Sequence, residues 1–321
     1  MNNKEIYKKT LTFSLRRFLW DFGSLILIVI VSALGFLISD KVSGNGFYGL
    51  AIGFAIIVVL IGIVSHFVSY IFKAGQIAMM TKGITEGKLP EDVYGAGKKV
   101  VKERFLTVAA YYAATRVIKG IFNQIGRGIT AIGEAVGGDA GGTVGSTISA
   151  VIQTIVAYLC DCCLGWVFYR TDKNAAKATL EGAVLFFKHG KTLLKNLGRV
   201  FGISLLSFLV IGGVFFGITY LICMAFPGAF EALAAEVTEL ANSGEVDSWF
   251  ANANNLMIVA GAMGGVTMWG ILHSVFVRPF ILVGVLRNYI ESGKNEKITE
   301  KDFEELDKKS AKFKKLHKAE S

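Results

Sequence analysis

The stretch VIQTIVAYLCDCCLGWVFYR, from Val151 to Arg170, decides how the rest of this chain is interpreted. It has the composition of an apolar helix, with one carboxylate, Asp161, in its middle and a basic segment that begins at its end. Arg170 follows nine residues after Asp161, roughly 13 Å along a helix. Asp161 would therefore lie near the middle of the bilayer if Arg170 marks the membrane surface.

Small and polar residues share the helix face that carries Asp161. At 100° per residue, four of them fall within about 60° of it: Thr147, Thr154, Tyr158 and Gly165. A charge in the membrane normally faces a bundle interior, a water-filled cavity or a partner charge. The stretch therefore predicts a polytopic membrane protein with a polar interior, without identifying what passes through it.

The composition predicts an all-α protein, a polytopic helical membrane bundle. The chain has 321 residues, of which 53% are hydrophobic and 18% charged, against about 25% charged in an average soluble domain. Several apolar runs reach the roughly 20 residues that a helical crossing needs. The net charge of +9 comes from basic residues beside these runs, which positive-inside topology explains. We therefore expect the lipid bilayer and anionic lipid headgroups as partners, and no nucleic acid.

Charge also predicts the topology, because Lys and Arg gather on the cytoplasmic side. Residues 1–18, 73–105 and 170–199 are basic and are expected inside, whereas 226–254 contains acids without Lys or Arg and is expected outside. An even number of crossings must then lie between 73–105 and 170–199. We expect about six transmembrane helices in the plasma membrane, with both termini cytoplasmic. The predicted crossings lie near residues 19–39, 48–72, 108–134, 143–169, 200–224 and 256–278.

Three parts follow from this topology: a cytoplasmic or interfacial lead-in (1–18), a membrane domain (19–290) and a charged cytoplasmic tail (291–321). Glycines spaced four apart are expected to let helices approach closely. These pairs are Gly49 and Gly53, Gly213 and Gly217, and Gly261 and Gly265. Pro279 is expected to kink or interrupt the last helix.

The segment from Leu106 to Val136 allows two interpretations. Its polar residues fall on one helical face, centred on Arg116, and are Tyr112, Arg116, Lys119, Asn123, Arg127, Thr130 and Glu134. This charged stripe belongs either to a helix lying on the inner membrane surface or to a crossing helix whose stripe faces other helices. If 106–134 does not cross, 143–169 must be a re-entrant hairpin. We favour the crossing.

The strongest candidate for a functional site is Asp161 with the cations of this stripe. We expect Asp161, Tyr158 and Thr154 to face the interior together with Tyr112, Arg116, Lys119, Asn123 and Arg127. The alternative is a structural ion pair beside an interfacial helix. His273 is a further candidate, through proton coupling, although a His bonded to a backbone group or a hydroxyl is the more ordinary arrangement. Lys188, Lys191, Lys195 and Arg199 are expected to contact lipid headgroups.

Catalytic and metal-binding signatures are lacking. Cys160, Cys162, Cys163 and Cys223 lie inside apolar runs, and packing explains them better than a metal site. GxxxxGK[ST], HExxH and GxSxG do not occur. We expect no cofactor, no metal and no enzyme activity.

Two stretches resemble the choline-transporter-like family. CDCCLGWVFYRTDKNAA from Cys160, and KNLGRV ending at Val200, are similar to that family's Cys-rich helix end and its following Lys-Asn-Ala and Asn-x-x-Arg-Val elements. The matching positions are Cys160, Cys162, Cys163, Lys173, Asn174, Ala175, Asn196 and Arg199. FVRPFILVGVLRNYIESGKN resembles the family's last crossing, although this chain lacks its large extracellular loop. The resemblance covers about a quarter of the chain and implies a transporter-like protein.

The sequence thus leaves two functions open. The leading hypothesis is a multi-pass plasma-membrane protein that binds or translocates a small polar or amphiphilic solute through a polar helix-bundle interior. The alternative is a non-transporting scaffold or accessory subunit that binds partner proteins or anionic lipid. The close-packing glycines also permit a homo-oligomer.

Overall fold

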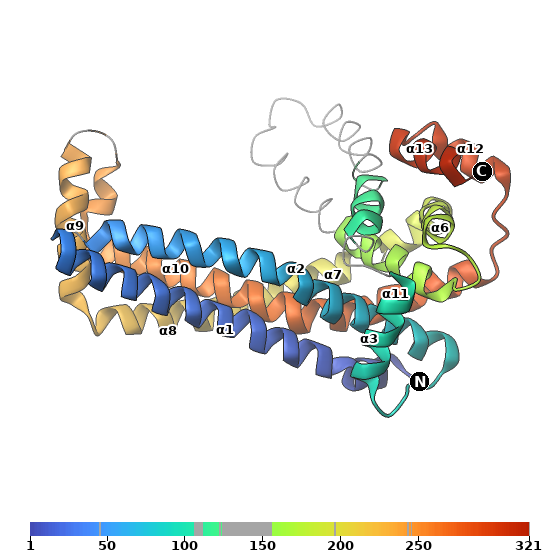
Figure 1. Ribbon diagram of the computed structural model, residues 1–321, viewed down its shortest axis with the longest axis horizontal. Coiled ribbons are helices and arrows are strands. Elements are labelled where there is room, and N and C mark those ends of the chain that lie inside the picture. The colour runs from blue at the N-terminus through green and yellow to red at the C-terminus, as the bar shows by residue number, and fades with distance from the viewer. Residues whose placement is uncertain are drawn as a thin grey trace. The chain divides into compact units, whose positions relative to one another are not determined.

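The computed structural model describes residues 1–44, 46–105, 112–121, 123, 156–195, 197–242, 244 and 246–320 (Figure 1). Within these ranges every regular element is a helix, which confirms the all-α class. Four described helices are long and apolar enough to cross a membrane: Asn3–Ser43, Tyr48–Glu86, Gly202–Met224 and Ala253–Lys294. These apolar helices indicate a membrane-embedded protein. The chain divides into two compact units, residues 1–198 with 279–321 and residues 199–278.

The first unit begins with a hairpin of two long helices, α1 (Asn3–Ser43) and α2 (Gly46–Glu86). The side chain of Asn2 caps α1 in a capping box with Glu5, and Gly44 ends it with a positive φ of 68°. The lead-in 1–18 is therefore the first part of α1 and not a separate helix. The predicted crossings 19–39 and 48–72 lie for the most part in the apolar half of this hairpin.

Glycines bring α1 and α2 into close contact. A Cβ added to Gly49 would lie 2.0 Å from the carbonyl oxygen of Gly35, and one added to Gly53 would lie 2.9 Å from that of Val31. The prediction that Gly49 and Gly53 let two helices approach closely is thus confirmed. A Cβ added to Gly62, on the same helix, would meet no described atom within 4 Å.

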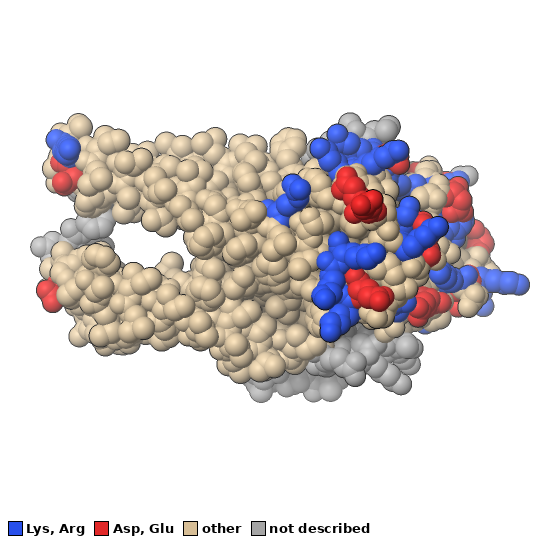
Figure 2. All heavy atoms as spheres, turned by 90° about the horizontal axis from the view of Figure 1, so that it is seen from below, with Lys and Arg blue, Asp and Glu red and all other residues tan. Residues whose placement is uncertain are grey.

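Exposure changes sharply along this hairpin. Side chains of the apolar stretch lie on the surface, as Leu27, Val29, Ile56 and Ile63 do. At the other end, Ile6 and Phe13 of α1 are buried against α2, where Gly75 and Gly83 make room for them. We call the compact part of this unit, where α1 begins and α2 ends, the head. On the face drawn in Figure 2, charged side chains gather mainly at one end of the long helices and few lie along their length.

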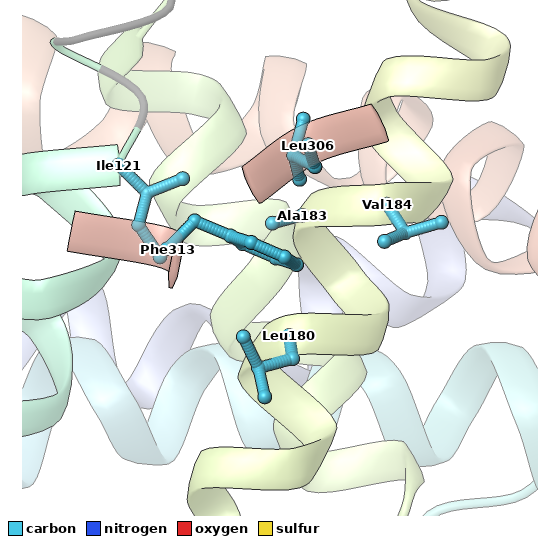
Figure 3. Packing of buried hydrophobic residues seen from close by; sticks show 6 residues of the cluster. All are labelled: Ile121, Leu180, Ala183, Val184, Leu306 and Phe313. Atoms are coloured by element: carbon cyan, nitrogen blue, oxygen red, sulfur yellow. The ribbon is translucent and has the colours of Figure 1, made fainter. Parts of the chain in front are cut away.

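The head is completed by shorter helices that surround the beginning of α1 and the end of α2. They are α3 (Val93–Arg104), a helix at 112–121, the apolar helix Val156–Tyr169, α6 (Ala175–Lys195), α11 (Arg278–Lys294), α12 (Glu300–Asp307) and α13 (Ala311–Glu320). One hydrophobic core joins several of them (Figure 3). Its buried members are Ile121, Leu180, Ala183, Val184, Leu306 and Phe313. The charged tail 291–321 therefore folds back onto α6.

The second unit is built mainly from α8 (Gly213–Met224) and α10 (Ala253–Leu272). The other elements are α7 (Leu197–Ser207), the π-helix η1 (Phe208–Gly212), α9 (Pro227–Asn242), the 3-10 helix η2 (Ser248–Ala251) and the π-helix η3 (His273–Val277). The predicted crossings 200–224 and 256–278 lie in its apolar helices. The acidic segment 226–254 contains α9.

The glycine face of the second unit differs in part from the prediction. Gly261 and Gly265 do allow close approach, since a Cβ on Gly265 would lie 2.6 Å from the carbonyl oxygen of Gly212. Among the described residues of the second unit, nothing lies within 4 Å of a Cβ added to Gly213 or Gly217, so that pair makes no close contact with α10. The side facing α10 carries Gly212, Phe216 and Thr219 instead, because a shift of one residue turns a helix by about 100°.

Of the two expected effects of Pro279, a kink or an interruption, the structure contradicts the interruption. Helix runs from Ala253 to Lys294, through η3 into α11. The π-helical turn lies immediately before the proline, and Arg278 donates its backbone N–H to the carbonyl oxygen of His273. A π turn is one of the local adjustments that accommodate proline in a helix.

The glycine contacts predict opposite effects for two identical substitutions in α2. Gly49→Ala should lower the stability of the detergent-solubilised protein by about 1–3 kcal/mol, because the methyl group would collide with the backbone of α1. Gly62→Ala should leave it unchanged or raise it by up to about 1 kcal/mol, because alanine favours the helix. Thermal unfolding followed by circular dichroism measures both, and equal effects would contradict the close contact.

Candidate functional site

Asp161 is buried in the head and bound to a lysine. Its carboxylate oxygen lies 2.7 Å from the Nζ of Lys73, and its side chain is only 4% exposed. The ends of these side chains meet because the helix Val156–Tyr169 packs against the end of α2, where the Oγ1 of Thr81 donates a hydrogen bond to the carbonyl oxygen of Gly165. Charge neutralisation explains how the carboxylate is tolerated at that depth.

The structure therefore changes the expected surroundings of Asp161. Its helix is buried along almost its whole described length, from Val156 to Phe168, as a helix that is apolar on all sides should be. Lys73 was assigned to the cytoplasmic segment 73–105 that follows the predicted crossing 48–72, and not to the candidate site. Its position directly after the apolar run 48–72 was the signal that could have identified it as a partner.

The charged stripe is described only in part. Arg116, Lys119 and Asn123 are exposed, and Tyr112 is half-buried. The opposite side of the same helix is buried, with Ile118 and Ile121 in contact with the head. In this part of the chain the cations thus face outward and the apolar residues face inward. Arg127, Thr154, most of the predicted crossing 108–134 and the first part of the crossing 143–169, up to residue 155, lie outside the described residues.

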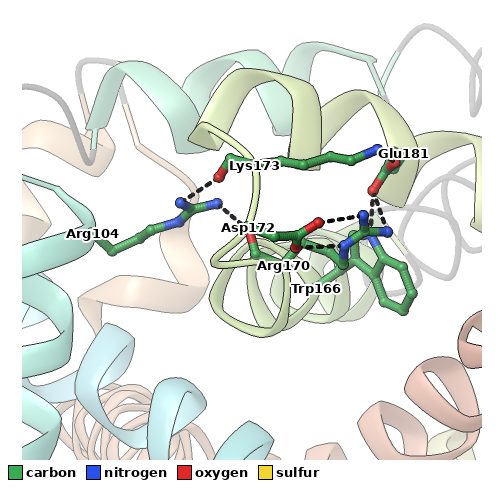
Figure 4. A network of polar contacts seen from close by, with 6 residues as sticks. All are labelled: Arg104, Trp166, Arg170, Asp172, Lys173 and Glu181. Atoms are coloured by element: carbon green, nitrogen blue, oxygen red, sulfur yellow. Dashed lines mark hydrogen bonds and ion pairs between the residues drawn. The ribbon is translucent and has the colours of Figure 1, made fainter.

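A polar network follows the helix that carries Asp161 (Figure 4). Arg170 makes two hydrogen bonds to Asp172, at 2.8 and 2.7 Å, and an ion pair at 3.0 Å with Glu181. Arg104 of α3 donates to the backbone carbonyl oxygens of Lys173 and Arg170, at 2.7 and 3.0 Å. These contacts tie α3 and α6 to the turn after Tyr169.

Glu181 is the buried centre of this network. Its side chain is 7% exposed and accepts contacts from Arg170, Lys173 and the indole nitrogen of Trp166. Sequence reasoning had counted Glu181 only as one acid within a basic segment. Its place within the apolar run from Leu180 to Phe187 was the available signal, because a buried carboxylate needs partners.

Asp172 shows how strongly this network acts on an exposed group. The hydrogen bonds from Arg170, together with its positive charge, lower the pKa of Asp172 from its ordinary 3.8 to about 2. The Asp172 side chain is 61% exposed, so solvent screens the pair and its contribution to stability is small.

A cavity of about 520 Å³ lies beside the network. Its lining residues are Trp166, Tyr169, Arg170, Asp172, Glu181, Gly293, Lys294, Glu296 and Ile298. The rings of Trp166 and Tyr169 lie 5.1 Å apart, and the Nζ of Lys294 lies 5.8 Å from the Tyr169 ring. Aromatic rings with both signs of charge could bind a small polar or zwitterionic solute.

Lys188 has internal partners that were not expected. Its Nζ lies 2.7 Å from Glu296 and 3.2 Å from Asp302, and it also donates to the carbonyl oxygen of Lys297. These bonds raise the pKa of Lys188 and fix the segment before α12 to α6. The predicted contact of Lys188 with lipid headgroups stays a prediction beside these internal bonds. The side chains of Lys191, Lys195 and Arg199 lie outside the described part of the chain.

The remaining candidate residues occupy separate places. Tyr158 is 2% exposed and lies one turn before Asp161 on the same helix. His273 belongs to the second unit, where its Nε2 lies 3.1 Å from the hydroxyl of Ser204 and its ring 5.2 Å from that of Trp269. Asn174 caps α6 by accepting a hydrogen bond from the backbone of Lys177, which explains why Lys-Asn-Ala stands at a helix start.

None of the four cysteines forms a disulfide, and Cys162 and Cys163 are fully buried. Among the described residues no three His, Cys, Asp or Glu side chains gather in a way that could hold a metal ion. No protein-family model, curated protein or solved structure matches this chain. The resemblance to the choline-transporter-like family therefore stays a prediction.

The Lys73–Asp161 pair predicts a strong dependence of each residue on the other. Lys73→Met should destabilise the protein by about 1–3 kcal/mol, because it leaves the buried carboxylate without its cation while Lys73 itself is one-third exposed. The double variant Lys73→Met with Asp161→Asn should recover most of this loss. Unfolding of the four forms of this mutant cycle measures the coupling, and additive effects would contradict a direct pair.

The pKa of Asp172 provides a test of the network. In Arg170→Gln we expect this pKa to rise from about 2 towards 3.8, measured by carboxyl NMR of labelled aspartate, with Lys177→Gln as the control. A lowered folded-state pKa stabilises the protein above the ordinary value, and this stabilisation is lost as pH falls through about 2. The variant should lack that acid-dependent loss. An unchanged pKa would contradict the assignment of Arg170 as its cause.

Proposed function

We propose that this chain is a non-transporting membrane scaffold, or accessory subunit, that is anchored by its apolar helices and holds a partner protein on the head. The observation that carries the proposal is that long-range side-chain bonds join the first and last described helices to the rest of the head. Arg287 of α11 donates to the carbonyl oxygen of Met1 at 2.7 Å, and Asn174 donates to Glu320 at 2.7 Å. A rigid platform at the end of an anchor is what a scaffold requires.

The length of α2 supports a head that lies outside the bilayer. From Gly46 to Lys73 the helix rises about 40 Å, whereas the hydrocarbon core is about 30 Å thick. If the turn at Gly44 lies at one membrane surface, the Lys73–Asp161 pair lies roughly 10 Å beyond the other. The pair would then fix the head and would not line a pathway. The basic N-terminus favours the cytoplasm as the side on which the head lies.

The exposed surfaces of the apolar helices also support the scaffold proposal. Within each unit these helices pair two by two, and their apolar side chains face outward on most sides, as Leu34 and Ile52 do in the first unit and Leu209 and Leu221 in the second. Taken by itself, the helix pair of either unit has no interior for a solute. In the part of the chain that the structure describes, the charged residues that were candidates for lining a pathway lie in the head.

Solute binding or translocation is the second candidate, and the cavity beside Trp166 favours it. Its aromatic and charged lining suits a small polar or zwitterionic molecule, and Glu181 in its wall is buried and ordered by three partners. This function requires the cavity to communicate with a polar path through an assembled bundle, formed with residues 106–155 or with a second copy of the chain.

The two functions can be distinguished by whether a partner protein stays bound to an intact head. In native membranes dissolved in mild detergent, we expect the wild type to migrate as a complex larger than the purified chain. Phe313→Asp should release the partner, because it places a charge in the hydrophobic core formed by α6, α12 and α13. Leu37→Ala, on the exposed apolar face of α1, is the control and should keep the complex.

The opposite result would favour transport. If the wild type, Phe313→Asp and Leu37→Ala all migrate alone, and reconstituted vesicles take up a polar solute in a manner that Asp161→Asn abolishes, the scaffold proposal is wrong. Normal insertion of each variant into the membrane, checked by carbonate extraction, is needed for either conclusion.

A further inference from the structure

The helix α3 lies across the end of the apolar hairpin. Tyr94 near its beginning contacts the ring of Phe72, with centroids 6.0 Å apart, and Phe105 at its end accepts a hydrogen bond from the hydroxyl of Tyr70 at 2.9 Å. The two ends of a helix about 18 Å long therefore reach almost the same level of α2. Figure 1 shows α3 running across the direction of α1 and α2.

The level at which α3 crosses is where the exposed apolar surface ends. On α2, Ile63 and Phe67 are 58% and 56% exposed, whereas Tyr70 is 5% exposed and Ala74 is fully buried. On α1, Leu19 is 69% exposed and Phe13 is buried. A helix that lies across this boundary occupies the position of an interfacial helix at the membrane surface.

Two lysines lie on the same side of α3 as Tyr94. Lys98 and Lys102 follow Tyr94 by four and eight residues and so share its side of the helix. Arg104, which binds the turn after Tyr169, points about 160° away from Lys102, towards the head. Both lysines are exposed, and neither makes an ion pair with any residue that the structure describes.

Arg16 adds a third cation to this surface. Its guanidinium carbon lies 4.1 Å from the centre of the Tyr94 ring, and Arg16 is exposed one turn before the apolar stretch of α1 begins. Lys73, at the same level of α2, is bound to Asp161 and does not belong to the group. Arg16 thus lies against the ring of Tyr94, and Lys98 and Lys102 follow Tyr94 by one and two turns of α3.

We propose that α3 is an interfacial helix whose Lys98 and Lys102, together with Arg16, bind the phosphate groups of anionic phospholipids in the membrane leaflet next to the head. The ring of Tyr94 would lie at the depth of the headgroups, where aromatic side chains are favoured. The cations would then attract lipids that carry a net negative charge over zwitterionic ones. The proposal requires the chain to be membrane-embedded and does not depend on whether the head holds a partner protein.

The test measures lipid preference in the full-length protein. The purified chain is mixed with equal amounts of phosphatidylglycerol and phosphatidylcholine in detergent, and retained lipids are counted by native mass spectrometry. We expect the wild type to retain phosphatidylglycerol preferentially. Lys98→Gln with Lys102→Gln should lower this preference about 25-fold, since each cation near a membrane surface contributes about fivefold.

Matched variants separate this site from general charge. Lys314→Gln with Lys315→Gln removes the same charge from exposed positions of α13 and should change nothing, whereas Lys98→Arg with Lys102→Arg should keep the preference. Equal loss in the α13 variant, or no loss in the α3 variant, would overturn the proposal. Inorganic phosphate at matched ionic strength should leave the lipid bound. If inorganic phosphate displaced the lipid completely, the site would be one for free phosphate, and this would also overturn the membrane assignment.

Discussion

The cost of burying the carboxylate of Asp161 is the constraint on which the head depends. A charge buried in protein must be neutralised, and the Nζ of Lys73 at 2.7 Å meets that requirement. Because Lys73 follows the apolar part of α2, the pair fixes the helix Val156–Tyr169 to the end of the anchor. On α6 the buried carboxylate of Glu181 is neutralised in the same way, by ion pairs with Arg170 and Lys173. These two buried carboxylates thus hold separate helices of the head in fixed positions relative to one another.

The apolar hairpins obey a different constraint. Their exposed Leu, Ile and Val side chains are stable only in lipid or against other apolar helices, so their close contacts come from small residues that let backbones approach. Gly35, Gly49 and Gly53 make this contact in the first unit, and Gly212 and Gly265 make it in the second. The head, in contrast, is stabilised by buried apolar cores and long-range polar bonds, as a soluble domain is. The protein combines both kinds of packing in one continuous chain, since α1 and α2 each belong to both parts.

The candidate site was only partly predictable. The buried position of Asp161 and its need for a cation follow from the residue's surroundings in the sequence. The partner did not, because Lys73 and Asp161 are far apart in the chain and many lysines lie beside apolar runs. Gly213 and Gly217 have the same four-residue spacing as Gly49 and Gly53, yet only the latter make contact. Spacing indicates a shared face, and packing decides whether another helix covers it.

The sequence by itself determined the helical class and the apolar character of the long helices, because both depend on local composition and length. It also determined that the basic segments accompany the ends of these helices. Only the tertiary structure decided which charges meet, that the C-terminal tail packs onto α6, and that Lys188 pairs with Glu296 and Asp302. These outcomes depend on contacts between residues distant in the chain, which helical periodicity does not encode.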